Sequence, residues 1–387
     1  MKCLMFYCQH ILGIGHLIRS MEIVRGLTDD FQVCFINGGE AVEGFHIPPG
    51  VEIVQLPPLK TDTEFTNLHL PSGFDTLDDL FAARGQQMIN ALRRFQPDIL
   101  MVELFPFGRR RFSPELLPLI EAARDRGTKI VSSLRDIVVT KQDQARHEAK
   151  VCKLMNQYFD LLLIHGDPQF MPLERSFSRV EDLHCPAFYT GYVVQAENGG
   201  PLLSLPRFSS PLLLASVGGG RFGHELLHCI AEASVYLEEK IPHQIQLFTG
   251  PFSPDAVYGQ LRKFAETRPN LTVERYTPNL MAYMRQADLS INMGGYNTTL
   301  NVLKTGVRSM LLPFTGNGDQ EQTIRAERLE ELGVVSVICP EDLQPKRFTQ
   351  RVVDYLQTRP TPIRFDLDGV AKTTSILRDF VQESMAA

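Results

Sequence analysis

Short apolar runs recur along the chain, and each is followed by a turn and then by apolar residues at helical spacing. The first run, 3–8, leads through a polar loop into a helix that presents Leu17, Met21, Val24 and Leu27 on one face. Further strands are predicted at 31–36, 51–56, 98–103, 129–134 and 161–165, with helices between them such as 80–95 and 116–126. Strands that alternate with helices indicate a parallel sheet covered on both faces.

The same pattern restarts after a turn-rich segment, 195–206, that has the composition of a linker. Strands are predicted at 212–217, 245–248, 271–275, 289–292, 308–312 and 334–338. We therefore expect an α/β protein with a first domain at 1–195, a linker at 196–206 and a second domain at 207–365. A terminal helix at 366–387 is expected to pack back on the first domain.

Length and charge narrow the class of protein. A chain of 387 residues suggests two domains, and a net charge of −6 argues against nucleic acid as the default partner. The seven cysteines lack paired spacing, which favours reduced thiols in a cytoplasmic protein. The sequence has no signal-peptide pattern and no apolar stretch of about 20 residues, so any membrane contact is expected to be peripheral.

A strand, a glycine turn and a helix start follow one another around Gly294 and Gly295. Asn297, Thr298 and Thr299 are residue types that cap helices, and a second strand and a polar loop at 314–322 lead to the same edge. Because a helix N-terminus carries unbonded N–H groups and partial positive charge, this stretch predicts a phosphate-binding site.

A second glycine loop, Gly218 to Gly223, matches the G-x-G-x-x-G dinucleotide pattern. In the dinucleotide pattern an acidic residue for the ribose ends the next strand, and here that residue is missing. The glycine loop can therefore be interpreted either as a diphosphate-binding loop or as a structural turn. The helix after it contains His224 and His228 in H-E-x-x-H spacing, but a third zinc ligand is lacking, so we interpret that match as coincidence and expect no metal site.

The first turn, Gly13-Ile-Gly-His16, places an imidazole at the carboxyl edge of the first sheet, where open α/β folds bind ligands. His16 could serve as a general base, because histidine titrates near neutral pH. The alternative is a surface residue that caps its own helix. Glu103, at the end of a predicted strand on the same edge, is a second candidate for the base, with a solvated loop carboxylate as the alternative.

Three motifs in this order form a larger pattern: Gly-x-Gly-His16-Leu-x-Arg19, then Ser216-Val-Gly-Gly-Gly, then Met293-Gly-Gly-Tyr-Asn-Thr-Thr-Leu with a segment that begins at Asp319. The chain resembles the GT-B glycosyltransferases, and among them the family-28 group that includes the lipid II N-acetylglucosaminyltransferase. The resemblance spans nearly the whole chain. It implies two facing Rossmann-like domains, with the acceptor on the first and a nucleotide-sugar donor on the second.

Individual residues take roles from this resemblance. The glycines Gly218, Gly219, Gly220, Gly294 and Gly295 with Thr298 would hold the diphosphate, Tyr276 and Thr277 would lie along the base, and Asp319 and Gln322 would bind the sugar. Asn301 stands where the family has a glutamate for the ribose, and Glu321 replaces a glutamine, so the donor can differ. Gly15, Ser216, Asn297 and Gln320 complete the expected substrate-binding set.

The resemblance implies a metal-independent, inverting hexosyltransferase that moves a sugar from a nucleoside diphosphate sugar, such as a UDP-sugar, to a hydroxyl acceptor. The acceptor would be a small molecule or lipid-linked, and no cofactor is needed. A nucleotide-sugar hydrolase of the same fold and a non-catalytic nucleotide-binding module remain as alternatives.

The segment Phe105 to Phe112 brackets three consecutive arginines with phenylalanines. A solvated charged loop is one interpretation. The other is a loop with exposed aromatics that docks the protein on anionic lipid at the inner face of the membrane.

Overall fold

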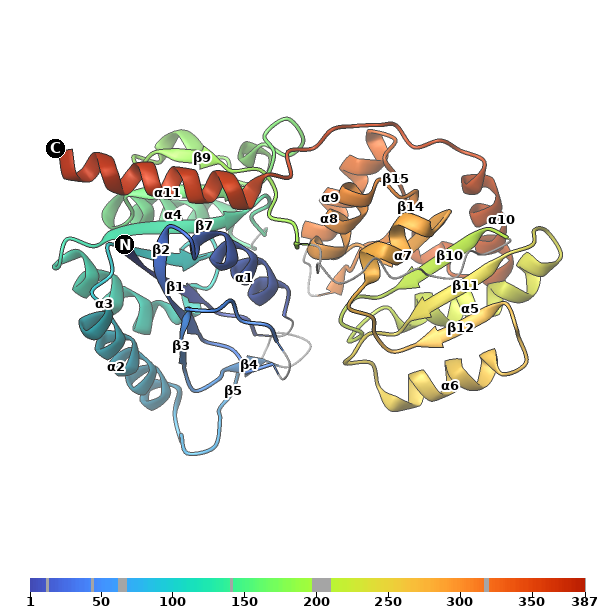
Figure 1. Ribbon diagram of the computed structural model, residues 1–387, viewed down its shortest axis with the longest axis horizontal. Helices are drawn as coiled ribbons and strands as arrows, with labels where there is room; N and C mark the ends of the chain where they lie inside the picture. The colour runs from blue at the N-terminus through green and yellow to red at the C-terminus, as the bar shows by residue number, and fades with distance from the viewer. Residues whose placement is uncertain are drawn as a thin grey trace. The chain divides into compact units, whose positions relative to one another are not determined.

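The computed structural model describes residues 1–11, 14–42, 45–61, 68–139, 142–196, 210–316 and 320–386. The chain divides into two compact units (Figure 1). Unit 1 consists of Met1–Gln195 with Phe365–Ala387, and unit 2 consists of Ala196–Arg364. Most of the expected linker, from 197 onward, lies outside the described residues.

Unit 1 is built on a seven-stranded parallel sheet with the order β3-β2-β1-β6-β7-β8-β9. Its strands are β1 Lys2–Cys8, β2 Phe31–Asn37, β3 Glu52–Gln55, β6 Ile99–Glu103, β7 Lys129–Arg135, β8 Leu161–His165 and β9 Ala187–Tyr189. A short antiparallel pair, β4 Lys60–Thr61 and β5 Leu68–His69, lies apart from this sheet.

Both faces of this sheet are buried, because successive side chains of a strand point to opposite faces. In β1, Leu4 and Phe6 belong to the core under α1 and α11, whereas Met5 and Tyr7 belong to the core under α2, α3 and α4. The helices are α1 Gly15–Leu27, α2 Leu77–Phe95, α3 Ser113–Arg124, α4 Gln144–Tyr158 and α11 Gly369–Ala386, with 3₁₀ turns η1 Arg110–Phe112, η2 Leu173–Arg175 and η3 Val180–Asp182. Helix α11 packs on α1 through Leu377 and other apolar residues (Figure 1).

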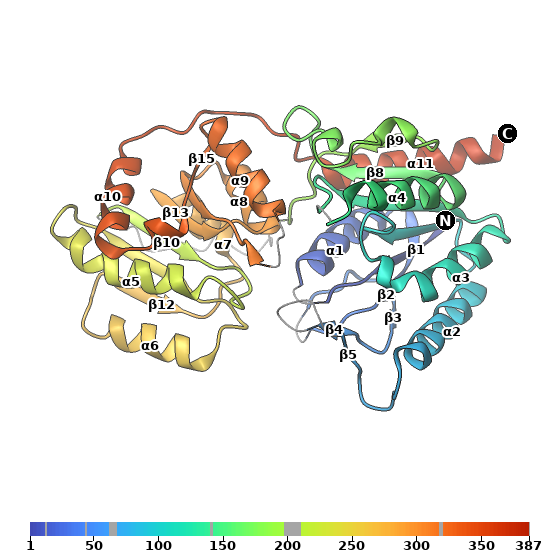
Figure 2. The ribbon, with the colours of Figure 1, turned by 180° about the vertical axis from the view of Figure 1, so that it is seen from behind.

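Unit 2 repeats this plan with a six-stranded parallel sheet in the order β12-β11-β10-β13-β14-β15. Its strands are β10 Leu212–Ser216, β11 Gln244–Phe248, β12 Leu271–Glu274, β13 Leu289–Met293, β14 Ser309–Leu312 and β15 Val335–Val337. Its helices are α5 His224–Glu238, α6 Asp255–Ala265, α7 Leu280–Gln286, α8 Tyr296–Thr305, α9 Glu321–Glu331 and α10 Pro345–Leu356, with the 3₁₀ turn η5 Pro340–Asp342. Helices α5 and α10 lie side by side (Figure 2).

Each sheet has one point where the strand order changes direction. In unit 1 it lies between β1 and β6, and in unit 2 between β10 and β13. The loops that leave neighbouring strands there run to opposite sides of the sheet, and the crevice outside the carboxyl ends of those strands is where such folds bind ligands. Two parallel α/β sheets of this kind confirm the predicted fold class.

The loop after β6 differs from the sequence-based expectation. Phe105, Phe107 and Phe112 are buried in the core of unit 1, so the expectation of exposed aromatics in this loop was wrong. A phenylalanine gains more free energy in the core than it would at the surface of a charged loop. Of the three arginines, Arg109 and Arg110 are partly buried and Arg111 is exposed.

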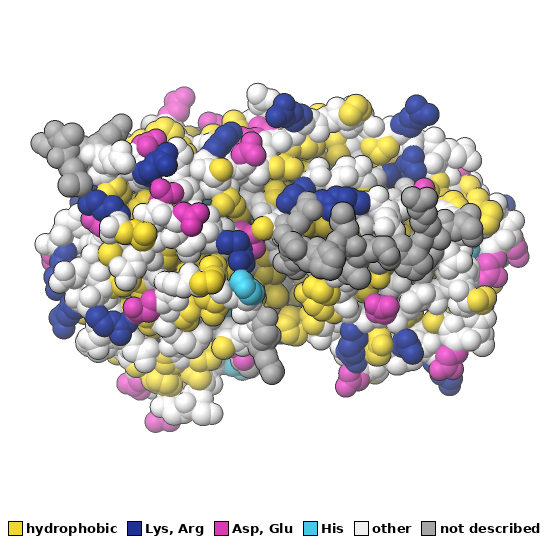
Figure 3. Space-filling model, in the orientation of Figure 1, with side chains coloured by type: hydrophobic (Ala, Val, Ile, Leu, Met, Phe, Trp, Pro, Cys, Tyr) yellow, Lys and Arg dark blue, Asp and Glu magenta, His cyan; other side chains and the backbone are white. Residues whose placement is uncertain are grey.

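The surface shows mixed charge. On the face drawn in Figure 3, Lys and Arg side chains are interspersed with Asp and Glu on both units. Within the described ranges, no helix is both long enough and apolar enough to cross a membrane.

Candidate active site

His16 and Glu103 meet at the strand-order reversal of unit 1. His16 lies in the first turn of α1, and Glu103 is the last residue of β6. The ring Nδ1 of His16 lies 2.7 Å from Oε1 of Glu103, whose side chain is fully buried, whereas that of His16 is 19% exposed. Arg19, one helical turn after His16, donates to the same oxygen at 2.5 Å. His16 therefore does not cap its own helix, and Glu103 is not a solvated loop carboxylate.

Burial and neighbouring charges set the protonation states of this pair. Burial, and after it the charge of Arg135, lowers the pKa of His16 to about 3, although Glu103 opposes the shift. Burial alone would raise the pKa of Glu103, but the His16 ring and the charges of Arg19 and Arg109 outweigh it and hold that pKa well below its usual range. At neutral pH the site therefore contains a carboxylate beside a neutral imidazole.

The carboxylate decides which ring nitrogen carries the proton. Because an ionised carboxyl group only accepts hydrogen bonds, Nδ1 of His16 must donate to Glu103. Nε2 is then the unprotonated nitrogen, and it can accept a proton from a hydroxyl group. Gly15, the first residue of α1, directly precedes His16 in the sequence.

Arg19 belongs to the Gly-x-Gly-His16 motif, but no role for it was predicted from the sequence. The structure assigns it one, since its guanidinium is buried and bonded to Glu103. The spacing His16-x-x-Arg19 was the available signal, because residues three apart share a helix face.

In unit 2, the loop from Gly218 to Gly220 leaves β10 in a conformation that requires glycine. Gly218 and Gly220 have φ angles of +64° and +85°, and a Cβ on Gly220 would lie 2.4 Å from the carbonyl oxygen of Thr249. Two side chains fix this loop: Oγ of Ser216 accepts the N–H of Gly218, and Nε2 of His224 donates to the carbonyl of Gly220. Within the described ranges, no three His, Cys, Asp or Glu residues are placed to hold a metal ion.

Helix α8 begins beside this loop, at the strand-order reversal of unit 2. A Cβ on Gly218 would lie 3.7 Å from Oγ1 of Thr298, in the first turn of α8. The residue before the helix is Gly295, which has no side chain to cap the helix N-terminus, so the expectation that Asn297, Thr298 and Thr299 cap it was wrong. They lie inside the helix. A Cβ on Gly295 would meet no atom within 4 Å, so the backbone is open there.

The remaining predicted donor residues lie around these two loops. Oε1 of Gln322 accepts the N–H of Phe314 at 3.0 Å and would lie 3.6 Å from a Cβ on Gly294. Gln320 immediately precedes α9 and is exposed. Asn301, in α8, is 6% exposed. Asp319 lies outside the described residues.

Tyr276 and Thr277 follow β12, on the same edge of the sheet. Tyr276 is 62% exposed, and Oγ1 of Thr277 accepts the N–H of Asn279. This segment is joined to the glycine loop through Gly250, which donates to the carbonyl of Arg275 and packs against the 218–220 backbone.

Comparison with known proteins indicates the class of enzyme to which this chain is similar. Residues 214–367 match the family model for the glycosyltransferase family 28 C-terminal domain. The chain is 26% identical over 363 residues to a UDP-N-acetylglucosamine--N-acetylmuramyl-(pentapeptide) pyrophosphoryl-undecaprenol N-acetylglucosamine transferase of Caldanaerobacter subterraneus subsp. tengcongensis, covering 90% of this chain and 89% of that one.

Solved structures of low sequence identity share the fold. UGT2 of Phytolacca americana, complexed with UDP-2fluoro-glucose and pterostilbene, matches with a TM-score of 0.64 at 17% identity. The match covers 99% of this chain and 94% of the UGT2 chain. MurG of Acinetobacter baumannii has a TM-score of 0.57 at 17% identity and covers 99% of both chains. The family model and the Caldanaerobacter relative identify the chain as a glycosyltransferase, and the solved structures show that its fold is GT-B. Within that class it is a family-28-like enzyme.

Proposed function

We propose that this enzyme transfers a hexose from a UDP-sugar to a hydroxyl group of an acceptor, without a metal ion and with inversion at the anomeric carbon. The observation that carries the proposal is the 2.7 Å contact between Nδ1 of His16 and Oε1 of Glu103 at the β1/β6 edge. His16 is the general base, and Glu103 is the residue that positions it. Unit 2 binds the donor, and unit 1 binds the acceptor.

In this mechanism Nε2 of His16 takes the proton of the acceptor hydroxyl as its oxygen attacks the anomeric carbon. The new carbon–oxygen bond forms on the face opposite the diphosphate, whose bond breaks, so the configuration inverts. The electron pair of the broken bond leaves with the diphosphate. The carboxylate of Glu103 stabilises the imidazolium that forms, because the two groups are already hydrogen-bonded in a buried site.

The leaving diphosphate needs stabilisation as its negative charge grows. The open backbone at Gly295, the first turn of α8, whose N-cap residue makes no side-chain hydrogen bond, and the adjacent loop at Gly218 offer N–H groups for this purpose. Preorganised N–H dipoles of this kind can replace a metal ion. The roles of Tyr276, Thr277, Asn301, Asp319 and Gln322 toward the base, the ribose and the sugar stay predictions of the same proposal.

The donor and acceptor classes rest on similarity. The name of the Caldanaerobacter relative specifies UDP-N-acetylglucosamine and a pyrophosphoryl-undecaprenol acceptor, and the Phytolacca structure is a complex with UDP-2fluoro-glucose and pterostilbene. We accordingly propose a UDP-sugar donor, a lipid-linked or small-molecule acceptor, and a cytoplasmic location at the inner face of the membrane.

A donor screen tests the function. The purified full chain is incubated with UDP-N-acetylglucosamine, UDP-glucose or UDP-galactose, with and without a lipid extract or a panel of small hydroxyl acceptors, in the presence of a chelator. The expected result is UDP release that depends on an acceptor and gives a product of inverted configuration. Stoichiometric free sugar without acceptor would favour a hydrolase, and tight nucleotide binding without turnover would favour a binding module.

A further inference from the structure

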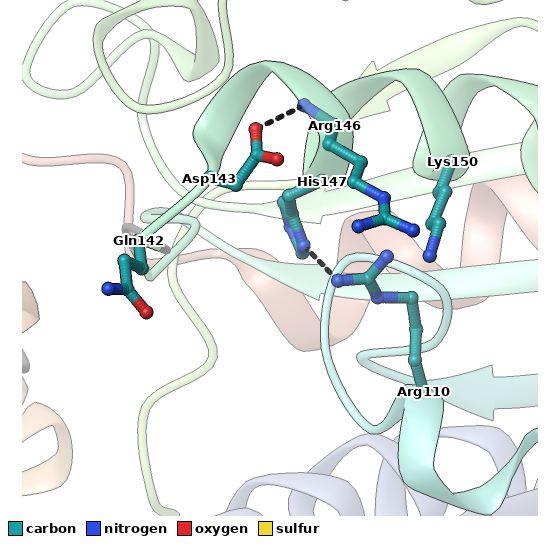
Figure 4. Close-up of a pocket in the computed structure, with 6 residues that line it drawn as sticks. All are labelled: Arg110, Gln142, Asp143, Arg146, His147 and Lys150. Carbon is teal, nitrogen blue, oxygen red and sulfur yellow. Dashed lines mark hydrogen bonds between the residues drawn. The ribbon is translucent and has the colours of Figure 1, made fainter.

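A pocket of about 400 Å³ lies on unit 1 at the start of α4, and neither His16 nor Glu103 is among the residues that line it. It is lined by Arg110, Gln142, Asp143, Arg146, His147 and Lys150 (Figure 4). The proposed transfer reaction assigns it no role. Of its lining, only Arg110 belongs to a segment considered in the sequence analysis, the loop 105–112.

Two elements bring its cationic side chains together. Helix α4 carries Arg146 and Lys150 four residues apart, which places them on one face of the helix. Arg110 comes from η1, in the loop after β6. In Figure 4 the side chains of Arg146 and Lys150 run alongside each other, and their nitrogen-bearing ends gather beside the guanidinium of Arg110.

These charges lack matching carboxylates. Arg110 donates to Nδ1 of His147 at 2.6 Å, which is a ring nitrogen and not an anion. Arg146 and Lys150 form no side-chain ion pair with any residue that the structure describes. The one acidic residue of the lining, Asp143, uses Oδ1 to cap α4 through the N–H of Arg146 at 3.0 Å.

This arrangement contrasts with other arginines of unit 1. Arg19 and Arg84 are each bonded directly to a carboxylate, Glu103 and Glu115 respectively. Like charges held close together repel one another, and the repulsion is relieved when an anion lies between them. A pocket that gathers three cations around one already engaged carboxylate is therefore suited to a multiply charged anion.

We propose that this pocket binds a phosphate or diphosphate group. Guanidinium groups offer paired N–H donors that match two phosphate oxygens, and a lysine adds a mobile point charge. Arg110, held by His147, is already oriented on one side of the pocket, so part of the ordering cost is met before a ligand binds. The group could belong to a lipid headgroup or to a free phosphorylated compound. The proposal does not require glycosyl transfer.

Calorimetry with inorganic pyrophosphate tests the site on the full chain. The pocket variant combines Arg146→Gln with Lys150→Gln. The control variant combines Arg126→Gln with Lys153→Gln, which removes the same charge from exposed positions outside the pocket lining. The glycine loops of unit 2 are intact in all three proteins, so any pyrophosphate bound there contributes equally. Equal melting temperatures show that the variants are folded.

We expect the pocket variant to lose charge-assisted hydrogen bonds to pyrophosphate. Its isotherm should therefore show one binding site fewer than those of the wild type and the control, or an affinity at that site that is at least about tenfold lower. Identical isotherms for all three proteins would overturn the proposal, as would equal weakening in both variants.

Sedimentation with vesicles at the same ionic strength separates the two sources of the phosphate group. Pelleting of the wild type, but not of the pocket variant, with vesicles that contain phosphatidic acid supports a lipid headgroup. Binding of pyrophosphate without vesicle pelleting supports a free phosphorylated ligand. Phosphatidylcholine vesicles provide the neutral control.

Discussion

Oε1 of Glu103 accepts hydrogen bonds from both His16 and Arg19, at 2.7 and 2.5 Å. The two donors lie one turn apart on α1, and the acceptor ends β6, so a single oxygen ties the helix to the neighbouring strand at the reversal of strand order. Because that oxygen is buried, the imidazole is held by groups that solvent does not screen. Orientation of His16 thus follows from the fold of unit 1 itself.

Replacement of this ring should remove most of the activity. For His16→Ala we expect turnover to fall by roughly 10²-fold or more, since general bases typically contribute that much. Donor affinity should change little, because the predicted donor residues belong to unit 2. Steady-state kinetics and nucleotide calorimetry on the same preparation measure both quantities. Wild-type turnover in this variant would exclude His16 as the base.

The charge of Glu103 can be tested apart from its shape. In Glu103→Gln an amide oxygen can still accept the Nδ1 hydrogen bond, but it no longer stabilises an imidazolium. We expect turnover to fall by about 10²-fold with little change in donor KM. A decrease of this size is typical when a general base becomes ineffective. Arg19→Lys, which keeps a positive charge beside the carboxylate, is the matched control and should lose less.

The pH profile of turnover follows from the pKa of His16. The base must be unprotonated, and burial together with Arg135 lowers its pKa to about 3. A lowered pKa keeps the ring unprotonated throughout the neutral range, so turnover should show no step near the ordinary histidine pKa of about 6.5. Arg135→Gln removes a charge that opposes protonation, so an acidic limb should move toward neutral pH. A step near 6.5 in the wild type would contradict this assignment.

Stability should depend on pH through the same histidine. In the unfolded chain His16 takes up a proton near pH 6.5, whereas in the folded chain it does so only near its lowered pKa of about 3. Between these values the unfolded state binds more protons, so the free energy of unfolding falls as pH falls, by up to about 1.4 kcal/mol per pH unit for one such group. The pKa of buried His165 is also lowered and adds to the trend.

Melting temperatures at pH 7 and pH 5 check this expectation. The loss of stability between the two pH values should be smaller in His16→Gln than in the wild type, because the variant has one titrating ring fewer. An equal loss in both proteins would show that His16 is not coupled to folding in this way.

Much of the fold could be predicted because parallel strands are buried on both faces. Their apolar runs are continuous, and every predicted strand is present with ends that differ by no more than one residue. The strand Ala187–Tyr189 was not predicted, since it is short and two of its three residues are exposed. The pair β4 and β5 was missed for the same reason of length.

Site residues that lie next to glycine turns could be predicted from the sequence. Contacts between residues that are far apart in the sequence could not. The glycines near 218 and 294 and the position of His16 follow from strand–turn–helix patterns. The bonds from His16 and Arg19 to Glu103 join residues more than 80 positions apart, which no local pattern encodes. Burial of Phe105 and Phe107 likewise depends on the core that surrounds them.

Two glycines of unit 2 separate a binding role from a folding role. Gly295 has φ of −62°, and an added Cβ would meet no atom within 4 Å. Alanine should therefore leave the melting temperature nearly unchanged. If a diphosphate lies against this backbone, however, the new methyl group occupies its place. We expect Gly295→Ala to weaken binding of UDP by about tenfold or more, which corresponds to about 1.4 kcal/mol.

The contrasting variant is Gly220→Ala. Gly220 has φ of +85°, and its Cβ would lie 2.4 Å from the carbonyl of Thr249, so the substitution strains the loop and lowers the melting temperature. Thermal melts and UDP calorimetry on both variants distinguish the two effects. Undiminished UDP affinity in a stable Gly295→Ala protein would mean that the diphosphate does not contact the start of α8, and the donor would have to be placed elsewhere on unit 2.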